Sequence, residues 1–153
     1  MQEKFMKMAI RQATKAVLKD EVPIGAVIVK DGVVLSRAYN LVEKRQDPTA
    51  HAEILAITKA CKKVGSWRLD GAEMYVTMEP CPMCAGAIVN ARISKVYFGA
   101  YENKSGGAIS KFCILTDSGL NHKTQFEGGI LQENCANIIK NYFKGKRYIK
   151  SLD

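Results

Sequence analysis

The feature that most constrains the fold is an apolar segment that leads into a helix and then into a second apolar segment. Residues 74–79 are typical of a buried strand, residues 82–90 of a helix with Pro82 at its first position, and residues 95–99 of another strand. Two strands joined in this way are expected to pair in parallel through a right-handed crossover. The chain is therefore predicted to have an α/β fold.

The segments around this unit predict further helices and strands. Apolar residues recur at three- and four-residue steps over residues 2–18, which predicts an amphipathic helix. The dipeptide Asp31-Gly32, between the strand-like residues 24–30 and 33–39, is a strong hairpin signal. Five further segments complete the pattern: a loop over 40–48, a helix that bears His51 and ends at Gly65, a loop over 100–122, a weak strand over 123–127 and a helix over about 131–143.

Length and composition fit one globular domain. The chain has 153 residues, 47% of them hydrophobic and 25% charged, so we expect a single domain over residues 1–153. No apolar run approaches the length of a membrane span, and the first residues are too charged for a signal peptide. Cys61, Cys113 and Cys135 are expected to be small buried side chains in a reducing compartment, which predicts a cytoplasmic protein.

Two short segments carry side chains that bind metals and move protons. Cys81 and Cys84 are three residues apart, which places them side by side on the first turn of a helix. His51 and Glu53 are two residues apart, so they converge only where side chains reach past a helix start. A catalytic zinc keeps three protein ligands and an open position for water. We therefore predict a zinc site on His51, Cys81 and Cys84, with Glu53 as the carboxylate that moves protons.

Three other interpretations of these residues are open. A Cys-x-x-Cys pair can be a redox pair. A structural zinc needs a fourth ligand, for which His122 or another cysteine is available. His51 can also be an ordinary core histidine that is unrelated to the cysteines.

His-x-Glu followed by Pro-Cys-x-x-Cys resembles the signature of the zinc-dependent nucleoside and nucleobase deaminases. Softer features resemble the bacterial tRNA adenosine deaminases: Val22-Pro23-Ile24-Gly25, Asn40, Asp47-Pro48-Thr49-Ala50-His51-Ala52-Glu53, Leu120-Asn121-His122 and a basic C-terminal segment. The resemblance implies a three-layer α/β/α fold of the cytidine-deaminase type, with a five-stranded mixed sheet between helices. It also implies one Zn²⁺ per subunit and a homodimer.

The resemblance also implies which residues contact the substrate. The base pocket is expected to be built from Pro23, Ile24, Asn40 and Ala52, with Asn40 hydrogen-bonded to the target base. The long loop is expected to grip the anticodon stem-loop of a tRNA. Its expected contacts are Glu102, Lys104, Asn121 and His122, and Glu102 stands where many family members carry Asp.

The formal net charge of +8 favours a polyanionic partner such as nucleic acid, although a solvated basic surface gives the same number. The basic helix and tail from about residue 131 interleave cations with aromatic side chains, which suits RNA. A solubilising tail is the alternative. The cations expected on the RNA backbone are Lys111, Lys123, Lys144, Lys146 and Arg147.

Together these features predict an enzyme that hydrolyses the wobble adenosine of a tRNA anticodon to inosine. A deaminase of a free base or nucleoside, such as guanine or cytosine, would use the same zinc chemistry, but it would need neither the charge of +8 nor the basic C-terminal segment. A third interpretation is a non-catalytic zinc module that binds RNA. The presence of Glu53 argues against that module, because such a module does not need a proton-moving carboxylate.

Overall fold

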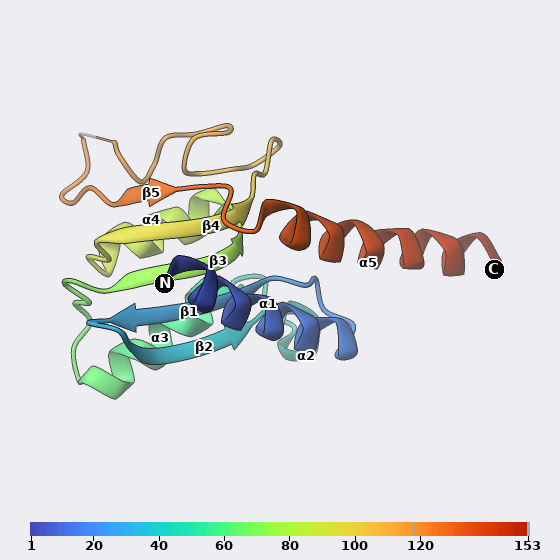
Figure 1. Ribbon diagram of the computed structural model, residues 1–153, viewed down its shortest axis with the longest axis horizontal. Helices are drawn as coiled ribbons and strands as arrows, with labels where there is room; N and C mark the ends of the chain where they lie inside the picture. The colour runs from blue at the N-terminus through green and yellow to red at the C-terminus, as the bar shows by residue number, and fades with distance from the viewer. Residues whose placement is uncertain (118, 153) are drawn as a thin grey trace.

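The sheet at the centre of the computed structural model has five strands in the order β2-β1-β3-β4-β5 (Figure 1). The structure describes residues 1–117 and 119–152, and for residues 147–152 it describes only the helical backbone. The strands are β1 Gly25–Lys30, β2 Val33–Tyr39, β3 Glu73–Met78, β4 Lys95–Ala100 and β5 Gln125–Glu127. β1 is antiparallel to β2 and β3, whereas β3, β4 and β5 are parallel. The predicted five-stranded mixed sheet is therefore confirmed.

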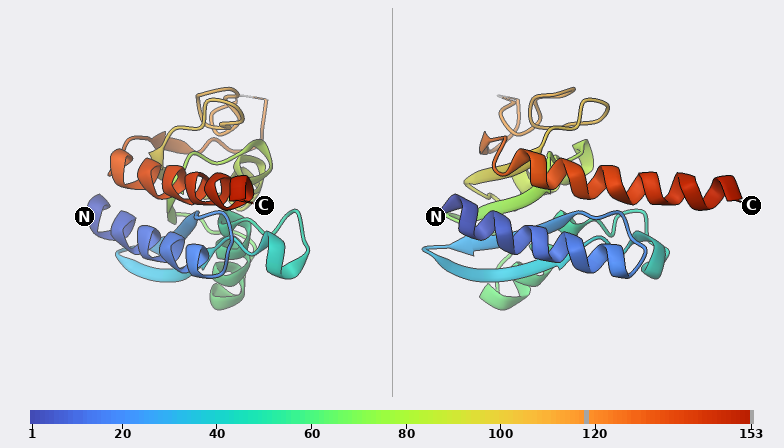
Figure 2. Two further views of the ribbon diagram at one scale, coloured as in Figure 1. Left: turned by 90° about the vertical axis from the view of Figure 1, so that its right-hand side faces the viewer. Right: turned by 45° about the vertical axis from the view of Figure 1, so that its right-hand side comes forward.

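Helices cover both faces of this sheet (Figure 2). They are α1 Gln2–Leu18, α2 Val42–Arg45, α3 Ala52–Val64, α4 Pro82–Asn90 and α5 Gln132–Leu152. Side chains of α1 and α5 share one hydrophobic core with the sheet, and side chains of α3 and α4 share the other. The three-layer α/β/α arrangement is confirmed. Among the helices that the structure describes, none has the length and apolar character needed to cross a bilayer.

The strands supply both cores by alternation. In β1, Ala26 and Ile28 belong to the core under α3 and α4, whereas Val27 and Val29 belong to the core under α1 and α5. This follows from the two-residue period of a strand, which turns successive side chains to opposite faces. A central strand buried on both faces therefore reads as a continuous apolar run.

Glycines are required at the β1–β2 turn and at the contact between α1 and β1. Asp31 and Gly32 have φ values of +50° and +76°, as a tight hairpin turn requires, so the predicted β1–β2 hairpin is confirmed. Gly25 lies against α1, where a Cβ would overlap the backbone carbonyl of Ala9. The close approach of α1 to β1 therefore depends on glycine at this position.

Several boundaries and roles differ from the sequence predictions. α5 continues nine residues past Phe143, because one glycine at position 145 costs only about 1 kcal/mol among good helix formers. The expected tail is therefore part of a helix that extends past the end of the sheet (Figures 1 and 2). The loop over 40–48 contains the one-turn helix α2, and β5 begins two residues later than expected. Cys135 is buried, but Cys61 is only half-buried and Cys113 is exposed, so burial was wrongly expected for Cys113.

The two outer strands are short or covered. β5 has only three residues. On β2, the Lys59 Nζ donates a hydrogen bond to the carbonyl oxygen of Arg37 at 3.0 Å, and the Lys63 Nζ donates to the carbonyl oxygen of Val34 at 3.5 Å. Both lysines come from α3, which lies under this edge of the sheet.

Candidate active site

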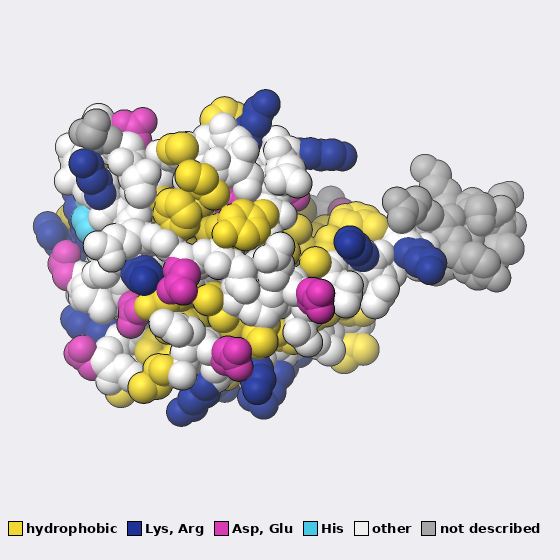
Figure 3. All heavy atoms as spheres, turned by 45° about the horizontal axis from the view of Figure 1, so that its top comes forward, with side chains coloured by type: hydrophobic (Ala, Val, Ile, Leu, Met, Phe, Trp, Pro, Cys, Tyr) yellow, Lys and Arg dark blue, Asp and Glu magenta, His cyan; other side chains and the backbone are white. Residues whose placement is uncertain are grey.

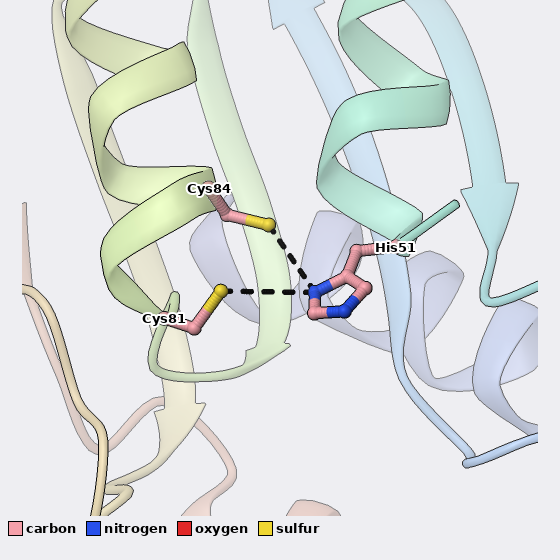
Figure 4. A group of neighbouring side chains, drawn as sticks. All are labelled: His51, Cys81 and Cys84. Atoms are coloured by element: carbon pink, nitrogen blue, oxygen red, sulfur yellow. Dashed lines mark hydrogen bonds between the residues drawn. The ribbon is translucent and has the colours of Figure 1, made fainter. Parts of the chain in front are cut away.

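The starts of α3 and α4 bring three potential metal ligands together (Figure 4). His51 is the N-cap residue of α3, and Cys81 is the N-cap residue of α4. β3 ends at Met78 and leads through Glu79 and Pro80 directly to Cys81. The side chains of Cys81 and Cys84 point toward the imidazole from the first turn of α4. The structure thus brings His51, Cys81 and Cys84 together over the starts of two helices, as the sequence predicts.

The distances between the ligand atoms suit a single metal ion. His51 Nδ1 lies 3.7 Å from Cys81 Sγ and 3.5 Å from Cys84 Sγ. All three ligand atoms lie within 4.8 Å of one another. Bond lengths of about 2.3 Å to sulfur and about 2.0–2.1 Å to nitrogen place S and N about 3.5 Å apart around a tetrahedral Zn²⁺. The donor set and its spacing therefore fit zinc, with three ligands and one open position.

The thiol groups are prepared unequally for metal binding. In the metal-free protein, hydrogen bonds from Cys84 and, to a smaller extent, from His51 lower the pKa of Cys81 to about 4, although burial opposes the shift. The hydrogen bond to Cys81 raises the pKa of Cys84, and burial adds to the effect. The contacts therefore favour the thiolate form of Cys81 and the thiol form of Cys84, so a metal bound to both sulfur atoms would displace a proton from Cys84.

Glu53 is a buried carboxylate next to these ligands. Its side chain is 3% exposed, and its Oε1 has no hydrogen-bond partner within the described part of the chain. Burial raises the pKa of Glu53 to about 7 in the metal-free protein, although its own backbone N–H and the charge of His51 act in the opposite direction. A buried polar atom without a partner is costly, so its presence beside three metal ligands indicates a role in chemistry.

A cavity of about 220 Å³ opens over the ligands and Glu53. It is smaller than the pockets of about 300–1,000 Å³ that hold drug-sized ligands, so it suits a single base. Side chains from several separate segments line it: Val22, Ile24, His51, Glu53, Met78, Glu79, Cys81, Glu102, Ser105, Ile139 and Phe143. Val22, Met78, Glu79, Ser105, Ile139 and Phe143 were not among the predicted site residues. Phe143 is one of the aromatic side chains that interleave with the C-terminal cations, and its place beside the cavity is visible only in the folded chain.

The four residues predicted to form the base pocket have different positions. Ile24 lines the cavity, whereas Pro23 and Ala52 are buried and do not line it. Asn40 is 4% exposed, and its Oδ1 accepts a hydrogen bond from the backbone N–H of Ala52 at 2.7 Å. Asn40 therefore fixes the start of α3, which carries His51 and Glu53.

Glu79 organises the long loop, a role that the sequence did not reveal. Its carboxylate accepts hydrogen bonds of 2.9–3.1 Å from four backbone N–H groups and another bond from the Ser110 hydroxyl. The backbone donors are Glu102, Ala108, Ile109 and Ser110. Burial alone would raise the pKa of Glu79, but these hydrogen bonds outweigh it and hold the pKa below its ordinary value. A Cβ at Gly106 would overlap this carboxylate, which explains the glycine there.

The predicted substrate contacts of the loop lie in two places. Glu102 lines the cavity and accepts a hydrogen bond from the backbone N–H of the exposed Lys104. His122 Nε2 lies 2.9 Å from the carbonyl oxygen of Ile93, just before β4 begins, and the exposed Asn121 is adjacent. The metal ligands lie at the other end of β3 and β4, about 20 Å away along a six-residue strand. His122 is therefore not part of the ligand cluster.

The predicted RNA-backbone cations are also spread over the surface. Lys111, Lys123 and Lys144 are exposed. Lys146 Nζ is 3.2 Å from Asp20 Oδ1, and Tyr142 donates a hydrogen bond to the same oxygen. This contact ties α5 to the turn after α1. The side chain of Arg147 lies outside the described residues.

The family of the chain follows from comparison with known proteins. A model of the MafB19-like deaminases matches residues 1–147. The chain belongs to this deaminase family. The tRNA-specific adenosine deaminase of Bacillus subtilis (strain 168) is 48% identical to this deaminase over 145 residues, which cover 95% of the chain and 90% of the relative. The family resemblance inferred from the sequence is confirmed.

Two solved structures are similar to this deaminase in different degrees. One, from work on A-to-I editing by tRNA:A34 deaminases at the wobble position of transfer RNA, is 43% identical, with a TM-score of 0.85. It covers 88% of this chain and 98% of the other. A guanine deaminase from Bacillus subtilis is 44% identical, with a TM-score of 0.63, and covers 72% of this chain and 69% of the other. The chain is therefore similar both to a protein from work on tRNA deaminases and to a deaminase of a free base.

Proposed function

We propose that this deaminase hydrolyses the adenosine at the wobble position of a tRNA anticodon to inosine and ammonia. The observation that carries the proposal is Glu53, a buried carboxylate with an unpartnered Oε1 among the described residues, beside His51, Cys81 and Cys84. The similarity to tRNA-specific adenosine deaminases over 95% of the chain supports the choice of substrate. The formal charge of +8 supports an RNA partner.

His51, Cys81 and Cys84 would hold the zinc ion, which supplies a Lewis acid that makes a water molecule nucleophilic. Glu53 accepts a proton from the attacking water and gives it to N1 of the adenine ring as the water oxygen adds to C6. Glu53 then carries the second proton of that water to the exocyclic amino group, which leaves as ammonia. Burial raises the pKa of Glu53 above its ordinary value in the metal-free protein, which favours a carboxyl group that can hold and release a proton.

The cavity would hold the base in place for this reaction. Val22, Ile24 and Phe143 offer apolar surface to the ring. Asn40 accepts the backbone N–H of Ala52 and so holds the start of α3 in place. By the family resemblance, its amide N–H groups would donate to the base. A base in an anticodon loop is unstacked more easily than a base in a duplex, so it can enter a cavity of this size. Asn121 and His122 would contact RNA away from the target base.

A second copy of the chain is the proposed protein partner. Exposed hydrophobic side chains gather on the side of the molecule that carries α4 and the 100–122 loop (Figure 3). The exposed hydrophobic side chains of α4 and of this loop include Met83, Tyr101, Ile109 and Phe112, which are 38–51% exposed. Apolar surface of this kind is typical of a protein interface. Light scattering of the zinc-loaded protein should give twice the monomer mass of 16.9 kDa.

Because the proposed substrate is a tRNA, the proposed location of the protein is the cytoplasm.

Parallel assays on the zinc-loaded protein test the proposed substrate. One substrate is an anticodon stem-loop with adenosine at the wobble position, and its matched control has the adenosine moved one position. The other is a panel of free bases and nucleosides that includes guanine and cytosine. We expect inosine only in the first RNA. Inosine in neither RNA, with zinc bound, would contradict the proposal.

Guanine deamination is the second candidate, because the guanine deaminase from Bacillus subtilis is 44% identical. Ammonia from free guanine, without inosine in RNA, would establish this candidate in place of the first. The zinc ligands and the role of Glu53 would be unchanged, because both reactions add water to a purine carbon that bears an amino group.

A further inference from the structure

α1 lies along the edge strand β2 on the sheet face that α1 and α5 cover (Figure 2). Residues of α1 and β2 line a basic groove there. Its volume is about 480 Å³. Its cationic lining consists of Lys4, Lys7, Arg11 and Lys15 from α1 and Arg37 from β2, all with exposed side chains. Steps of three and four residues place the α1 cations in one row along the helix. The proposed deamination uses none of these residues.

The groove contains like charges without acidic partners. No acidic side chain among the described residues lines it. Across the same part of the chain, the ion pairs within 4.0 Å are formed elsewhere, by Arg68 with Asp70, Lys95 with Glu127 and Lys146 with Asp20. Like charges at helical spacings of three and four residues repel each other. A bound anion would relieve this repulsion along the whole row.

The shape of the groove favours a nucleic-acid backbone over a membrane surface. A helix that lies on a membrane inserts an apolar face between the lipids. The apolar face of α1 is occupied, because Phe5, Met6, Ala9 and Ala13 are at most 3% exposed in the core. The cations also stand on two walls, one from a helix and one from a strand, which suits a polyanion that runs along a groove.

The groove lies close to the candidate active site. Gln12, which lines the groove, packs against Gly25 at the start of β1. The preceding residue, Ile24, lines the cavity over Glu53. From this point the row of cations runs along α1, and successive cations three or four residues apart are separated by about 4.5–6 Å along the axis. An RNA whose base occupies the cavity can therefore reach the groove with a neighbouring part of its backbone.

We propose that this groove binds the sugar–phosphate backbone of the substrate RNA outside the anticodon loop. The inference rests on the proposed function, because it takes the RNA as the substrate of the same protein. The groove contributes affinity and orientation, and it takes no part in the chemical step. Its contribution is electrostatic, so it weakens as added salt makes the release of phosphate counterions less favourable.

The test compares two double variants of the zinc-loaded full-length protein that remove the same charge. Arg11→Gln with Lys15→Gln removes two groove cations, and glutamine keeps the helix propensity. Lys30→Gln with Lys62→Gln removes two exposed cations outside the groove and is the matched control. Arg37→Gln tests the strand wall without any change in α1. Binding of a full-length tRNA with wobble adenosine is measured by fluorescence anisotropy from 50 to 300 mM salt, and inosine formation at saturating tRNA is measured beside it.

We expect the groove variant to raise Kd about tenfold or more and to reduce the slope of log K against log salt by about 2, one for each phosphate that is no longer neutralised. Arg37→Gln should lower the slope by about 1. The turnover rate at saturating tRNA should not change.

A groove variant that binds tRNA like the control variant would overturn the proposal. So would unchanged tRNA affinity together with abolished binding to phosphatidylserine vesicles. A wild-type protein that forms no inosine would refute the proposed function instead, and the binding data would still decide the role of the groove.

Discussion

Glu53 and Glu79 are two buried glutamates that line the same cavity and are each 3% exposed, yet their environments are opposite. Glu53 has an oxygen with no partner in the described residues, and burial raises its pKa to about 7. Glu79 accepts bonds from four backbone N–H groups and a hydroxyl, which hold its pKa below the ordinary value. The same side chain is thus prepared to exchange protons in one place and to remain charged in the other.

The difference teaches how to separate a reacting carboxylate from a structural one. Hydrogen-bond donors stabilise the charged form of a carboxylate, and a site without them favours the neutral form. Burial alone therefore does not identify the reacting group, because both glutamates are buried. The number of hydrogen-bond donors separates the two residues and supports the role proposed for Glu53. Each of the following experiments changes one side of this comparison.

Replacing Glu53 by glutamine should have the largest effect. Loss of the proton carrier should lower the deamination rate by about 10²–10⁴-fold or more. Zinc content, measured by mass spectrometry of the metal, should stay at the wild-type level because Glu53 is not among the three ligand residues. Loss of zinc from this variant would make Glu53 a structural residue and would remove the contrast with Glu79.

Replacing Glu79 by glutamine should mainly lower stability. Glutamine offers one acceptor oxygen and two unwanted donors to a ring of N–H groups, which should cost about 3 kcal/mol or more. For a domain of this size that loss lowers Tm by about 6–12 °C. Amide exchange at Ala108, Ile109 and Ser110 should accelerate, because these residues donate to the carboxylate. Unchanged protection of these amides would show that the loop does not depend on Glu79.

In the metal-free protein, Glu53 and Glu79 should change the free energy of unfolding in opposite directions as the pH rises. Glu53 has a pKa raised from 4.5 to about 7, so its burial costs stability that grows as pH rises from about 4.5 to 7. Glu79 has a pKa below 4.5, so its contribution is present above pH 4.5 and is lost as pH falls through its lowered pKa. Denaturant unfolding across the acidic and neutral pH range measures both.

Relative to the wild type, Glu53→Gln should gain stability between about pH 4.5 and 7 and keep a constant advantage above that range. Glu79→Gln should be less stable at neutral pH and should approach the wild type as pH falls below 4.5. Differences that run in the same direction for both variants would refute the assigned environments.

Replacing Ser110 by alanine should give the smallest effect. This change removes one donor from Glu79 and leaves the four backbone donors in place. Loss of one hydrogen bond to a charged group should cost about 1.5–3 kcal/mol at most, less than the loss of the carboxylate itself. Thermal unfolding measures this cost, and Thr58→Ala, which removes a hydroxyl bonded to a helix carbonyl outside the site, is the control. Equal losses for Ser110→Ala and Glu79→Gln would mean that the backbone donors contribute little.

The sequence predicts the cluster of potential metal ligands from one local pattern and one motif. Cys81 and Cys84 converge through one helix turn. His51 is the N-cap residue of the preceding helix α3, 30 residues before Cys81, and only the resemblance of the His-x-Glu and Pro-Cys-x-x-Cys segments to one signature joins it to the cysteines. The role of Glu79 was not predictable, because its donors lie 23–31 residues away in an irregular loop. The contribution of Phe143 to the cavity depends on how α5 docks, which no local pattern specifies.

The surroundings of Trp67 also depend on distant residues. Trp67 is 62% exposed, and the guanidinium groups of Arg68 and Arg92 lie over its ring at 5.6 and 5.7 Å. Arg92 lies 25 residues further along the chain, so the sequence alone does not bring it to the indole. The strands and the hairpin were predictable, because short apolar runs and the Asp31-Gly32 turn are local signals.

The two outer strands limit how copies of this protein can associate. An uncovered edge strand offers free N–H and C=O groups to a strand from another chain. Here the lysines of α3 occupy carbonyl oxygens of β2, and β5 is only three residues long. A shared sheet that runs from one copy into the next is therefore disfavoured at both ends. Copies that associate must meet through helices and loops, and the same protection lowers the tendency of the folded chain to form fibres.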